Sequence, residues 1–493
     1  DGNGKNIALA RALLSCKKDL KYYARSVSRR GFIAQSGEWI ADMKRAQITP
    51  DKLQTYADSL PESAYAEKMG DLARIYGGYS DILADKFVDG EDVLAAAIDA
   101  VPQSKLVQDA DVLVYGFDVI TDDFARLLCA ITASCSASWV YLVMDRQDVP
   151  DGDCFAPVRD SAERLRTRLL QAGLRREWLW LDGEPMDAPE DIRALEARLL
   201  RPAPAPYQQI PQHITLFEAA TPYAEAHYIA QEIVACARRG VAYGDIAILC
   251  GNMAAYASVL DTVLRQYDIP AYIAVKEPLL SHGLVRLLLS AVRAATGGYR
   301  AEDLLTAIKS GYAPLSQEEA WQLENYALAY GINGARWREP FARGSEEERE
   351  IPEQARQKLY PILKRLQDGL REARDAAQSL RALMNLLTDC DAYHTLLAQE
   401  DALVRAGMAD EAVRTRQVWT RLLALLEQMH EIAGGARIPG STVAAWIEAG
   451  LMDEGISSLP PSEGCVTVGE IGNLIAFDPR ITFACGLHSE GAG

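Results

Sequence analysis

The sequence has no long apolar run and no closely spaced cysteine pair. The first absence argues against a membrane-spanning protein, and the second argues against a framework of metal sites or disulfides. No apolar stretch approaches the roughly 18 residues of a membrane-spanning helix, and the N-terminus has no signal-peptide pattern. The nine cysteines form no CxxC pair, and most lie in apolar runs. These patterns favour buried free thiols over a metal or disulfide framework, and predict a cytoplasmic protein with no membrane partner.

The chain also has fewer basic than acidic residues. The chain has 51 Lys and Arg against 69 Asp and Glu, a formal net charge of −18. This balance argues against a surface that binds nucleic acid everywhere, although a local basic groove remains compatible with it. His213, His227 and His282 are isolated from one another and lack metal-ligand spacing.

A phosphate-binding loop is missing as well. ATP hydrolysis requires backbone amides and a Lys around the phosphates, together with carboxylates for magnesium and water. The pattern GxxxxGK[ST] occurs nowhere in the chain. Residues 2–6, GNGKN, contain Gly-Lys but lack the first Gly at the required spacing, the hydroxyl residue and a preceding strand. They are better interpreted as the start of a helix.

The residues that are present predict a globular protein of two to four domains. The chain has 493 residues, of which 49% are hydrophobic and 24% charged. It starts with Asp1 rather than Met and stops just after a strand-like run. We therefore expect an internal fragment of a larger protein.

Helical and α/β patterns alternate along the chain. Residues 4–100 repeat apolar side chains at helical spacing and contain no evident strand. Strand-like and helical segments then alternate, which is typical of a parallel α/β sheet. The predicted strands are DVLVY, SWVYLVMD, REWLWLD, HITLFEA, DIAILC, AYIAV, CVTVGEI and ITFACGL.

Two interruptions define the domain organisation. Pro202, Pro204, Pro206 and Pro211 indicate a stiff linker. Residues 284–449 are helical, too long for a loop, and therefore predict a domain inserted into the second α/β unit. The predicted divisions are a helical subdomain of the first unit at 1–104, the rest of that unit at 105–200, the linker at 201–212, the second unit at 213–283, the insertion at 284–462, and return strands at 463–493.

This order of elements resembles superfamily-one DNA helicases of the UvrD type, and several segments resemble the AddB subunit of bacterial AddAB helicase–nucleases. The segments are VLVYGFDVITDDFARLL, the run from TPYAEAHYIAQEIV to YDIPAYI, ENYALAYGINGARW, and VTVGEIGNLIAFDPRITFACGLHSEG. The second of these segments resembles the opening of the second motor domain across the whole helicase superfamily, and its markers are Glu225, Ile229, Ile233, Tyr243, Asp245, Ile269 and Pro270. The resemblance covers essentially the whole chain and is specific as a combination.

The resemblance implies a fold, partners and cofactors. The fold would be α/β, with two RecA-like parallel-sheet units that each accompany a helical subdomain, as in UvrD- and RecC-like proteins. The partners would be an AddA-type helicase–nuclease subunit, in a heterodimer, and single-stranded DNA. The parent complex would use ATP, Mg²⁺ and an iron–sulfur cluster, whereas we expect no cofactor and no catalytic or metal-binding residue in this chain.

Departures from the pattern of active relatives predict an inactive motor. After the strand that ends at Tyr115, Gly116 and Phe117 stand where active helicases carry two carboxylates, and Asp118 follows too late. Gly251 lies where active relatives have an Arg that reaches ATP, so no cation would stabilise the phosphate charge. The segment VTVGEIGNLIAFDP lacks the His and Lys-Gly of active motors.

If the motor is inactive, the activity that remains for this chain is DNA handling. A reader of single strands uses aromatic faces with nearby Arg or Lys. Tyr115, Phe117 and Thr121 follow the C-terminal end of a predicted parallel strand, where sheet folds place ligands. Trp337 and Arg338 form a second aromatic–basic pair. Core packing is the competing interpretation for each of these five residues.

We therefore predict a helicase-like scaffold without a working ATPase, within a helicase–exonuclease that acts in double-strand-break repair and recombination. Two alternatives stay open. One is an active superfamily-one helicase whose phosphate loop lies outside the sequence. The other is a structural adaptor that contacts only protein, which the charge of −18 favours.

Overall fold

A computed structural model describes most of the chain and divides it into two compact units. The described residues are 2–27, 29–46, 48–84, 87, 90–144, 155–175, 177–181, 187–199, 205–274, 276–452, 454–457, 464–472 and 479–487. Unit 1 comprises residues 1–42, 48–86 and 219–493, and unit 2 comprises residues 43–47 and 87–218. Each unit is described by itself below.

The N-terminal residues are helical, as predicted. The helices are α1 (Gly2–Cys16), α2 (Arg30–Arg45), α3 (Pro50–Ser59) and α4 (Ala64–Leu83). Asp71 on α4 is fully buried and accepts hydrogen bonds from the backbone N–H groups of Lys21, Tyr22 and Tyr23 at 2.7–3.0 Å. One carboxylate thereby fixes the turn after α1.

Unit 2 contains a two-stranded parallel sheet. Its elements are α5 (Gly90–Ala100), η1 (Val101–Gln103), β1 (Asp111–Val114), α6 (Asp122–Ser134), β2 (Ala137–Val140), α7 (Ala156–Gln171) and α8 (Glu190–Glu196). Strands β1 and β2 pair in parallel, with Val112 opposite Ser138. One face of the sheet packs on α6 and α7 around Ile120, Leu128 and Leu165. The opposite face leaves Leu113, Tyr115, Trp139, Tyr141 and Val143 exposed.

Two predicted strands are wrong, and the proline segment is only partly described. Residues 177–181 of REWLWLD and residues 213–219, HITLFEA, lie outside any strand. A strand requires a paired neighbour, and apolar alternation alone does not supply one. Trp178 and Trp180 instead contact each other at 5.8 Å between ring centroids. Pro202 and Pro204 of the predicted linker lie outside the described residues.

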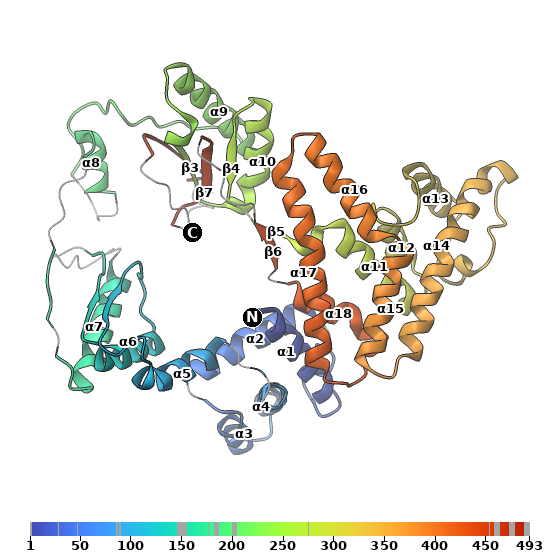
Figure 1. The fold of residues 1–493 in the computed structure, drawn as a ribbon, viewed down its shortest axis with the longest axis horizontal. Helices are drawn as coiled ribbons and strands as arrows, with labels where there is room; N and C mark the ends of the chain where they lie inside the picture. Colours follow the sequence, from blue (N-terminus) through green and yellow to red (C-terminus); the bar gives the residue numbers. More distant parts are fainter. Residues whose placement is uncertain are drawn as a thin grey trace. The chain divides into compact units, whose positions relative to one another are not determined.

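The sheet of unit 1 is parallel and assembles strands from distant parts of the chain. Its order is β4-β7-β3-β8. The strands are β3 (Ile246–Cys250), β4 (Ala271–Ile273), β7 (Val466–Glu470) and β8 (Ile481–Cys485), and the accompanying helices are α9 (Pro222–Arg238), η2 (Tyr243–Asp245) and α10 (Met253–Gln266). Helices α9 and α10 lie beside the sheet, and their apolar faces complete its core (Figure 1). The expected parallel α/β architecture is thus confirmed.

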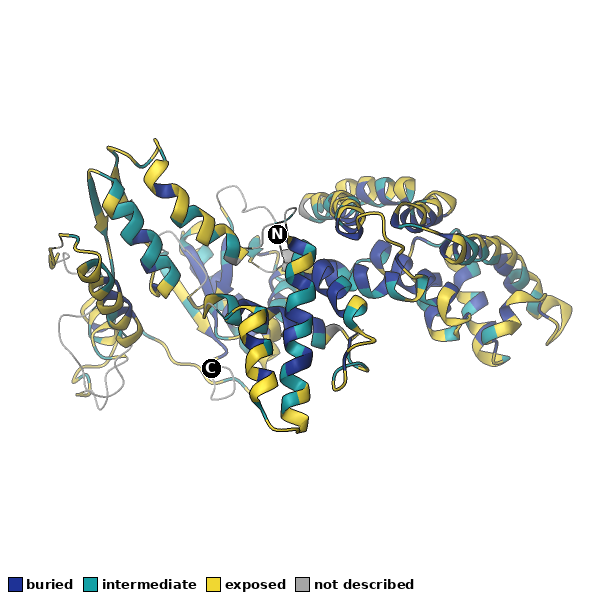
Figure 2. Ribbon diagram, turned by 90° about the horizontal axis from the view of Figure 1, so that it is seen from below, coloured by how far each residue is buried: buried dark blue, intermediate teal, exposed yellow. Residues whose placement is uncertain are grey.

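A helical insertion separates β4 from β7. It contains α11 (Gly283–Gly297), α12 (Ala301–Ile308), α13 (Gln317–Ala329), η4 (Gly334–Arg338), α14 (Glu346–Glu372), α15 (Ala376–Asp389), α16 (Ala392–Arg405), α17 (Ala409–Ala433) and α18 (Gly440–Gly450). At its base, β5 (Lys276–Pro278) pairs antiparallel with β6 (Gly455–Ser457), next to η3 (Leu279–Ser281). Buried residues follow the inner sides of these helices, and most of α11 is buried (Figure 2).

Helix α1 packs on α17 and α18, more than 400 residues away in sequence. A Cβ added to Gly450 would lie 2.3 Å from Leu425 Cδ1 and 3.1 Å from Ile7 Cδ1, so the three helices meet closely there. Among the described residues, no helix combines the length and apolar character needed to cross a bilayer.

The prediction of buried thiols holds for half of the eight described cysteines, and the other four are partly exposed. Cys236, Cys250, Cys390 and Cys485 are buried, and none of the eight forms a disulfide. Cys154 lies outside the described residues.

Candidate functional site

The carboxyl end of β1 turns sharply and presents aromatic side chains. Gly116 adopts a φ of 84°, a conformation that glycine reaches without strain. Tyr115 is 77% exposed, and Asp118 is also exposed. The turn therefore separates Asp118 from the end of the strand.

Phe117 packs partly against its own unit. Its ring lies 4.6 Å from that of Phe124, and 43% of the residue stays exposed. Thr121 is the N-cap of α6, because its hydroxyl oxygen accepts the Phe124 N–H at 3.3 Å. The Thr121 side chain thus has a structural role, whereas Tyr115 and part of Phe117 are open to a ligand.

The two acidic residues at the start of α6 are engaged in ion pairs. Arg168 binds Asp122 at 2.5 Å, and Arg126 binds Asp123 at 3.1 Å. The pairing with Asp122 raises the pKa of Arg168. Within the described residues, no three His, Cys, Asp or Glu side chains gather in a group that could hold a metal ion.

Three residues contact one another at the carboxyl end of β8, an edge strand of the unit 1 sheet. Glu225, in the first turn of α9, accepts the Tyr256 hydroxyl at 2.5 Å and the Gly486 N–H at 3.1 Å. Tyr256 is only 2% exposed, and burial together with Glu225 raises the pKa of its hydroxyl. We call Glu225, Tyr256 and Gly486 the edge latch. It ties α9, α10 and the residue after β8 together, at the edge where parallel sheets bind ligands.

Gly251 and its neighbours also serve the fold. The Gly251 N–H donates to the Cys485 carbonyl at 3.0 Å, which continues the β3–β8 pairing beyond the strand. Asn252 is the N-cap of α10, and its side chain accepts the Ala255 N–H at 3.2 Å. The two residues that follow β3 therefore start the next helix.

Trp337 and Arg338 are neighbours with opposite exposures. Trp337 is 2% exposed and packs edge-on against Phe341 at 5.7 Å. Arg338 is exposed and lies over the Tyr299 ring, 5.4 Å from its centroid. The indole is covered by this chain, so only Arg338 of this pair presents a group to an external ligand.

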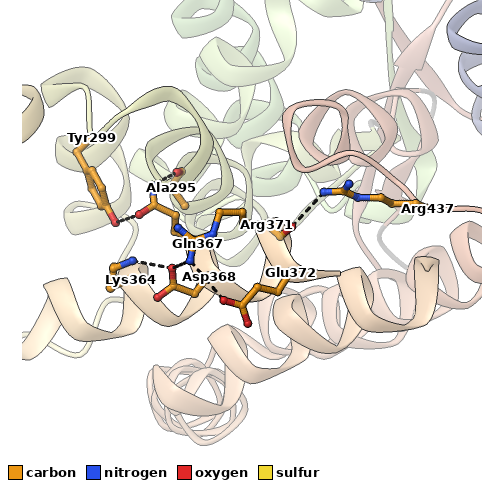
Figure 3. Close-up of polar contacts among 8 residues, drawn as sticks. All are labelled: Ala295, Tyr299, Lys364, Gln367, Asp368, Arg371, Glu372 and Arg437. Carbon is orange, nitrogen blue, oxygen red and sulfur yellow. Dashed lines mark hydrogen bonds and ion pairs between the residues drawn. The ribbon is translucent and has the colours of Figure 1, made fainter. Parts of the chain in front are cut away.

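Tyr299 is held firmly beneath Arg338. Its hydroxyl donates to Gln367 Oε1 at 3.1 Å, and Gln367 Nε2 donates to the Ala295 carbonyl at 2.8 Å (Figure 3). Burial raises the pKa of Tyr299 to about 12. On the same stretch of α14, Asp368 pairs with Lys364 and Arg371 at 2.6 and 2.9 Å. The contact of Gln367 with Ala295 joins α14 to α11, whereas the ion pairs of Asp368 lie within α14.

Sequence reasoning missed a clasp next to the proline segment. Asp191 on α8 accepts the backbone N–H groups of Gln212 and His213 at 2.7 and 2.8 Å, and lies 3.0 Å from His213 Nδ1. In the sequence, His213 stands isolated from any residue of matching chemistry. The sequence does show an acidic residue in the first turn of a short helix. That pattern does not indicate which distant residue the carboxylate contacts.

We expect this clasp to open in acid. The hydrogen bonds from His213 and Gln212 lower the pKa of Asp191 from 3.8 to about 2. A lowered pKa in the folded state contributes stability above the ordinary pKa, and this contribution is lost as the pH falls from about 4 towards 2. Proteolysis at residues 205–212 by an acid-active protease should increase over that range. Asp191→Asn should make it fast throughout that pH range, unlike the exposed Asp187→Asn control.

Comparisons with known proteins match this chain along nearly its whole length. The family model described as "ADDB, N-terminal" matches residues 1–196. The AddB subunit of the ATP-dependent helicase/deoxyribonuclease of Pelotomaculum thermopropionicum is 30% identical across 98% of this chain. The corresponding subunits from Clostridium novyi and Geobacillus thermodenitrificans are 24% and 27% identical across 99% and 98% of it. The chain is thus similar to AddB subunits along nearly its whole length, and its residues 1–196 match the AddB family model.

These AddB relatives are much longer than this chain. The chain spans 44% of the Pelotomaculum protein and 45% of the Geobacillus protein. The matched region of the family model covers unit 2 as far as α8 and the N-terminal helices of unit 1. The residues of the edge latch lie beyond that region, in the part that only the longer relatives cover.

Proposed function

We propose that this chain forms part of the AddB subunit of an ATP-dependent helicase–deoxyribonuclease that acts in DNA double-strand-break repair and recombination. Within it, the two α/β units with their helices are RecA-like units that have become a scaffold. The scaffold guides or reads one DNA strand and holds an AddA-type motor–nuclease partner. It performs no ATP hydrolysis or DNA cleavage of its own.

The edge latch is the observation that carries this proposal. A working motor binds nucleotide at the carboxyl edges of its parallel strands. Here Glu225, Tyr256 and Gly486 occupy that edge of unit 1 with contacts to one another. In unit 2, β1 ends in an exposed tyrosine and a glycine turn rather than in two carboxylates.

The residues present do not fit the cofactors of the parent complex. An ATP–Mg²⁺ site requires a phosphate loop, which the sequence lacks, and free carboxylates, whereas Asp122 and Asp123 are paired with arginines. An iron–sulfur cluster requires grouped cysteines, and the described cysteines form no such group. ATP, Mg²⁺ and the cluster would belong to other parts of the complex.

We expect no ATPase activity from this chain, with or without single-stranded DNA. Asp118→Ala should leave the phosphate-release rate at the level of a protein-free blank, because Asp118 lies beyond the Gly116 turn. A coupled phosphate-release assay measures this. ATP hydrolysis that is abolished by Asp118→Ala would favour an active helicase instead.

Exposed aromatic groups at the end of β1 predict contact with single-stranded DNA. Stacking of a base on an aromatic ring contributes roughly 1–3 kcal/mol, so Tyr115→Ala should weaken binding of an oligothymidine by about tenfold. Tyr65→Ala is the matched control, since Tyr65 is also an exposed tyrosine, at 51%. Fluorescence anisotropy at several salt concentrations gives both the affinity and its salt dependence.

The same measurement separates guidance of DNA from a protein-only adaptor. The net charge of −18 is the observation that favours the adaptor. Salt-dependent binding that is about tenfold weaker in Tyr115→Ala and unchanged in Tyr65→Ala supports guidance of a strand. Binding that is absent, or equally weak in both variants, would favour the adaptor.

A further inference from the structure

Two buried cysteines lie in contact across neighbouring strands of the unit 1 sheet. Cys250, the last residue of β3, is in register with Cys485, the last residue of β8. Their Sγ atoms are 3.2 Å apart, and both residues are 0% exposed. The two residues are 235 positions apart in sequence. No sequence spacing predicts this pair.

We propose that Cys250 and Cys485 are a redox-reactive thiol pair that a peroxide converts into a disulfide. This inference is independent of the proposed function. Oxidation would tie the strand that returns from the helical insertion covalently to the strand that precedes it.

Backbone geometry allows the bond with little movement. Neighbouring strands lie about 4.8 Å apart, and disulfides join Cα atoms separated by about 4.4–6.8 Å. Residues in register on neighbouring strands point to the same face of the sheet. Because the sulfurs are already in contact, small rotations of the two side chains are sufficient.

The environment gives the two sulfurs different roles. The hydrogen bond from Cys485 lowers the pKa of Cys250, whereas that bond and burial raise the pKa of Cys485. Of the two sulfurs, Cys250 is therefore the one that loses its proton more readily. The charge of Glu225 acts to raise the pKa of Cys250. The Glu225 carboxylate is held by hydrogen bonds from Tyr256 and Gly486 in the edge latch.

The reaction balances with hydrogen peroxide as the oxidant. The Cys250 thiolate attacks one peroxide oxygen, the O–O bond breaks, and after protonation a sulfenic acid and one water result. The sulfur of Cys485 then attacks the Cys250 sulfur, the S–O bond breaks, and a second water leaves with the Cys485 proton. Two thiols are oxidised by two electrons, and one peroxide is reduced to two waters.

The test uses the folded chain, because oxidation of an unfolded chain would scramble all nine thiols. Hydrogen peroxide is added without denaturant, free thiols are then blocked with N-ethylmaleimide, and the protein is digested without reduction. Peptide mass spectrometry should find the Cys250 peptide joined to the Cys485 peptide. On a non-reducing denaturing gel, the cross-linked chain should migrate faster, because a large loop is closed.

A matched variant separates this pair from buried thiols in general. Cys390 is 3% exposed and lies in the helical insertion, so Cys390→Ala should leave the cross-link and the fast-migrating band unchanged. Cys250→Ala and Cys485→Ala should each abolish both. If peroxide yields no Cys250–Cys485 peptide from the folded wild-type chain, or if Cys390→Ala removes it, the proposal is overturned, whether or not the other variants fold.

Discussion

Replacing Glu353 with alanine is expected to destabilise the helical insertion by about 3–5 kcal/mol, because a buried charge loses its partner. Arg356 donates to Glu353 through Nη2 at 2.6 Å and through Nε at 2.7 Å. The exposed fractions of the two side chains are 8% for Arg356 and 18% for Glu353. With alanine at position 353, the guanidinium would stay buried without a carboxylate.

The loss of stability in Glu353→Ala should extend to the segment that contains Arg338. Glu353 also accepts the Phe341 N–H at 2.9 Å, and Arg356 donates to the Trp337 carbonyl at 3.4 Å. Urea unfolding gives the free energy. Glu350→Ala removes an exposed glutamate one turn earlier on α14 and should change stability by less than about 0.5 kcal/mol. Equal losses in both variants would contradict the argument.

The stability that the Glu353 carboxylate contributes should depend on pH. Burial acts to raise the pKa of Glu353, but hydrogen bonds from Arg356 and Phe341 outweigh it, so the pKa lies below its ordinary value of 4.5. Its contribution to stability is therefore complete above that ordinary value and is lost as the pH falls through the lowered pKa. The difference between wild type and Glu353→Ala should shrink in acid over that range.

The second large effect is expected from Glu225→Ala, which removes the acceptor at the centre of the edge latch. The Tyr256 hydroxyl and the Gly486 N–H would both lose their partner, and Tyr256 is almost fully buried. Unpaired buried donors cost roughly 1–3 kcal/mol each, so we expect a loss of about 3 kcal/mol in the free energy of unfolding. Urea titration monitored by circular dichroism measures it.

Tyr256→Phe provides the control for this variant. Phenylalanine keeps the ring packing and removes only the hydroxyl, so a smaller loss of about 1 kcal/mol is expected. The stability lost in the double variant should be smaller than the sum of the losses in the two single variants, because both single changes break the same hydrogen bond. Strict additivity would show that Glu225 and Tyr256 act independently, and the latch would then have no energetic basis.

Some of the candidate site could be predicted from sequence because it depends on local chemistry. The apolar run before Tyr115 forms a strand, and Thr121 before two aspartates begins a helix, both as expected. The absence of a phosphate loop needed no structure. Residues 177–181 and 213–219 failed as strands because alternation records which side chains are apolar, and not whether a neighbouring strand is there to pair with them.

The alternation of helical and parallel α/β segments and the lack of nucleotide-binding motifs follow from the order of the amino acids alone. The three-dimensional fold was needed to show that Trp337 is covered while Arg338 is exposed, and that Glu225 binds Tyr256 and Gly486 at the end of β8. The contact of Cys250 with Cys485 likewise exists only after β8 has returned beside β3. The physical reason is range: periodicity and capping act within a few residues, whereas these contacts join atoms that lie up to hundreds of residues apart in sequence.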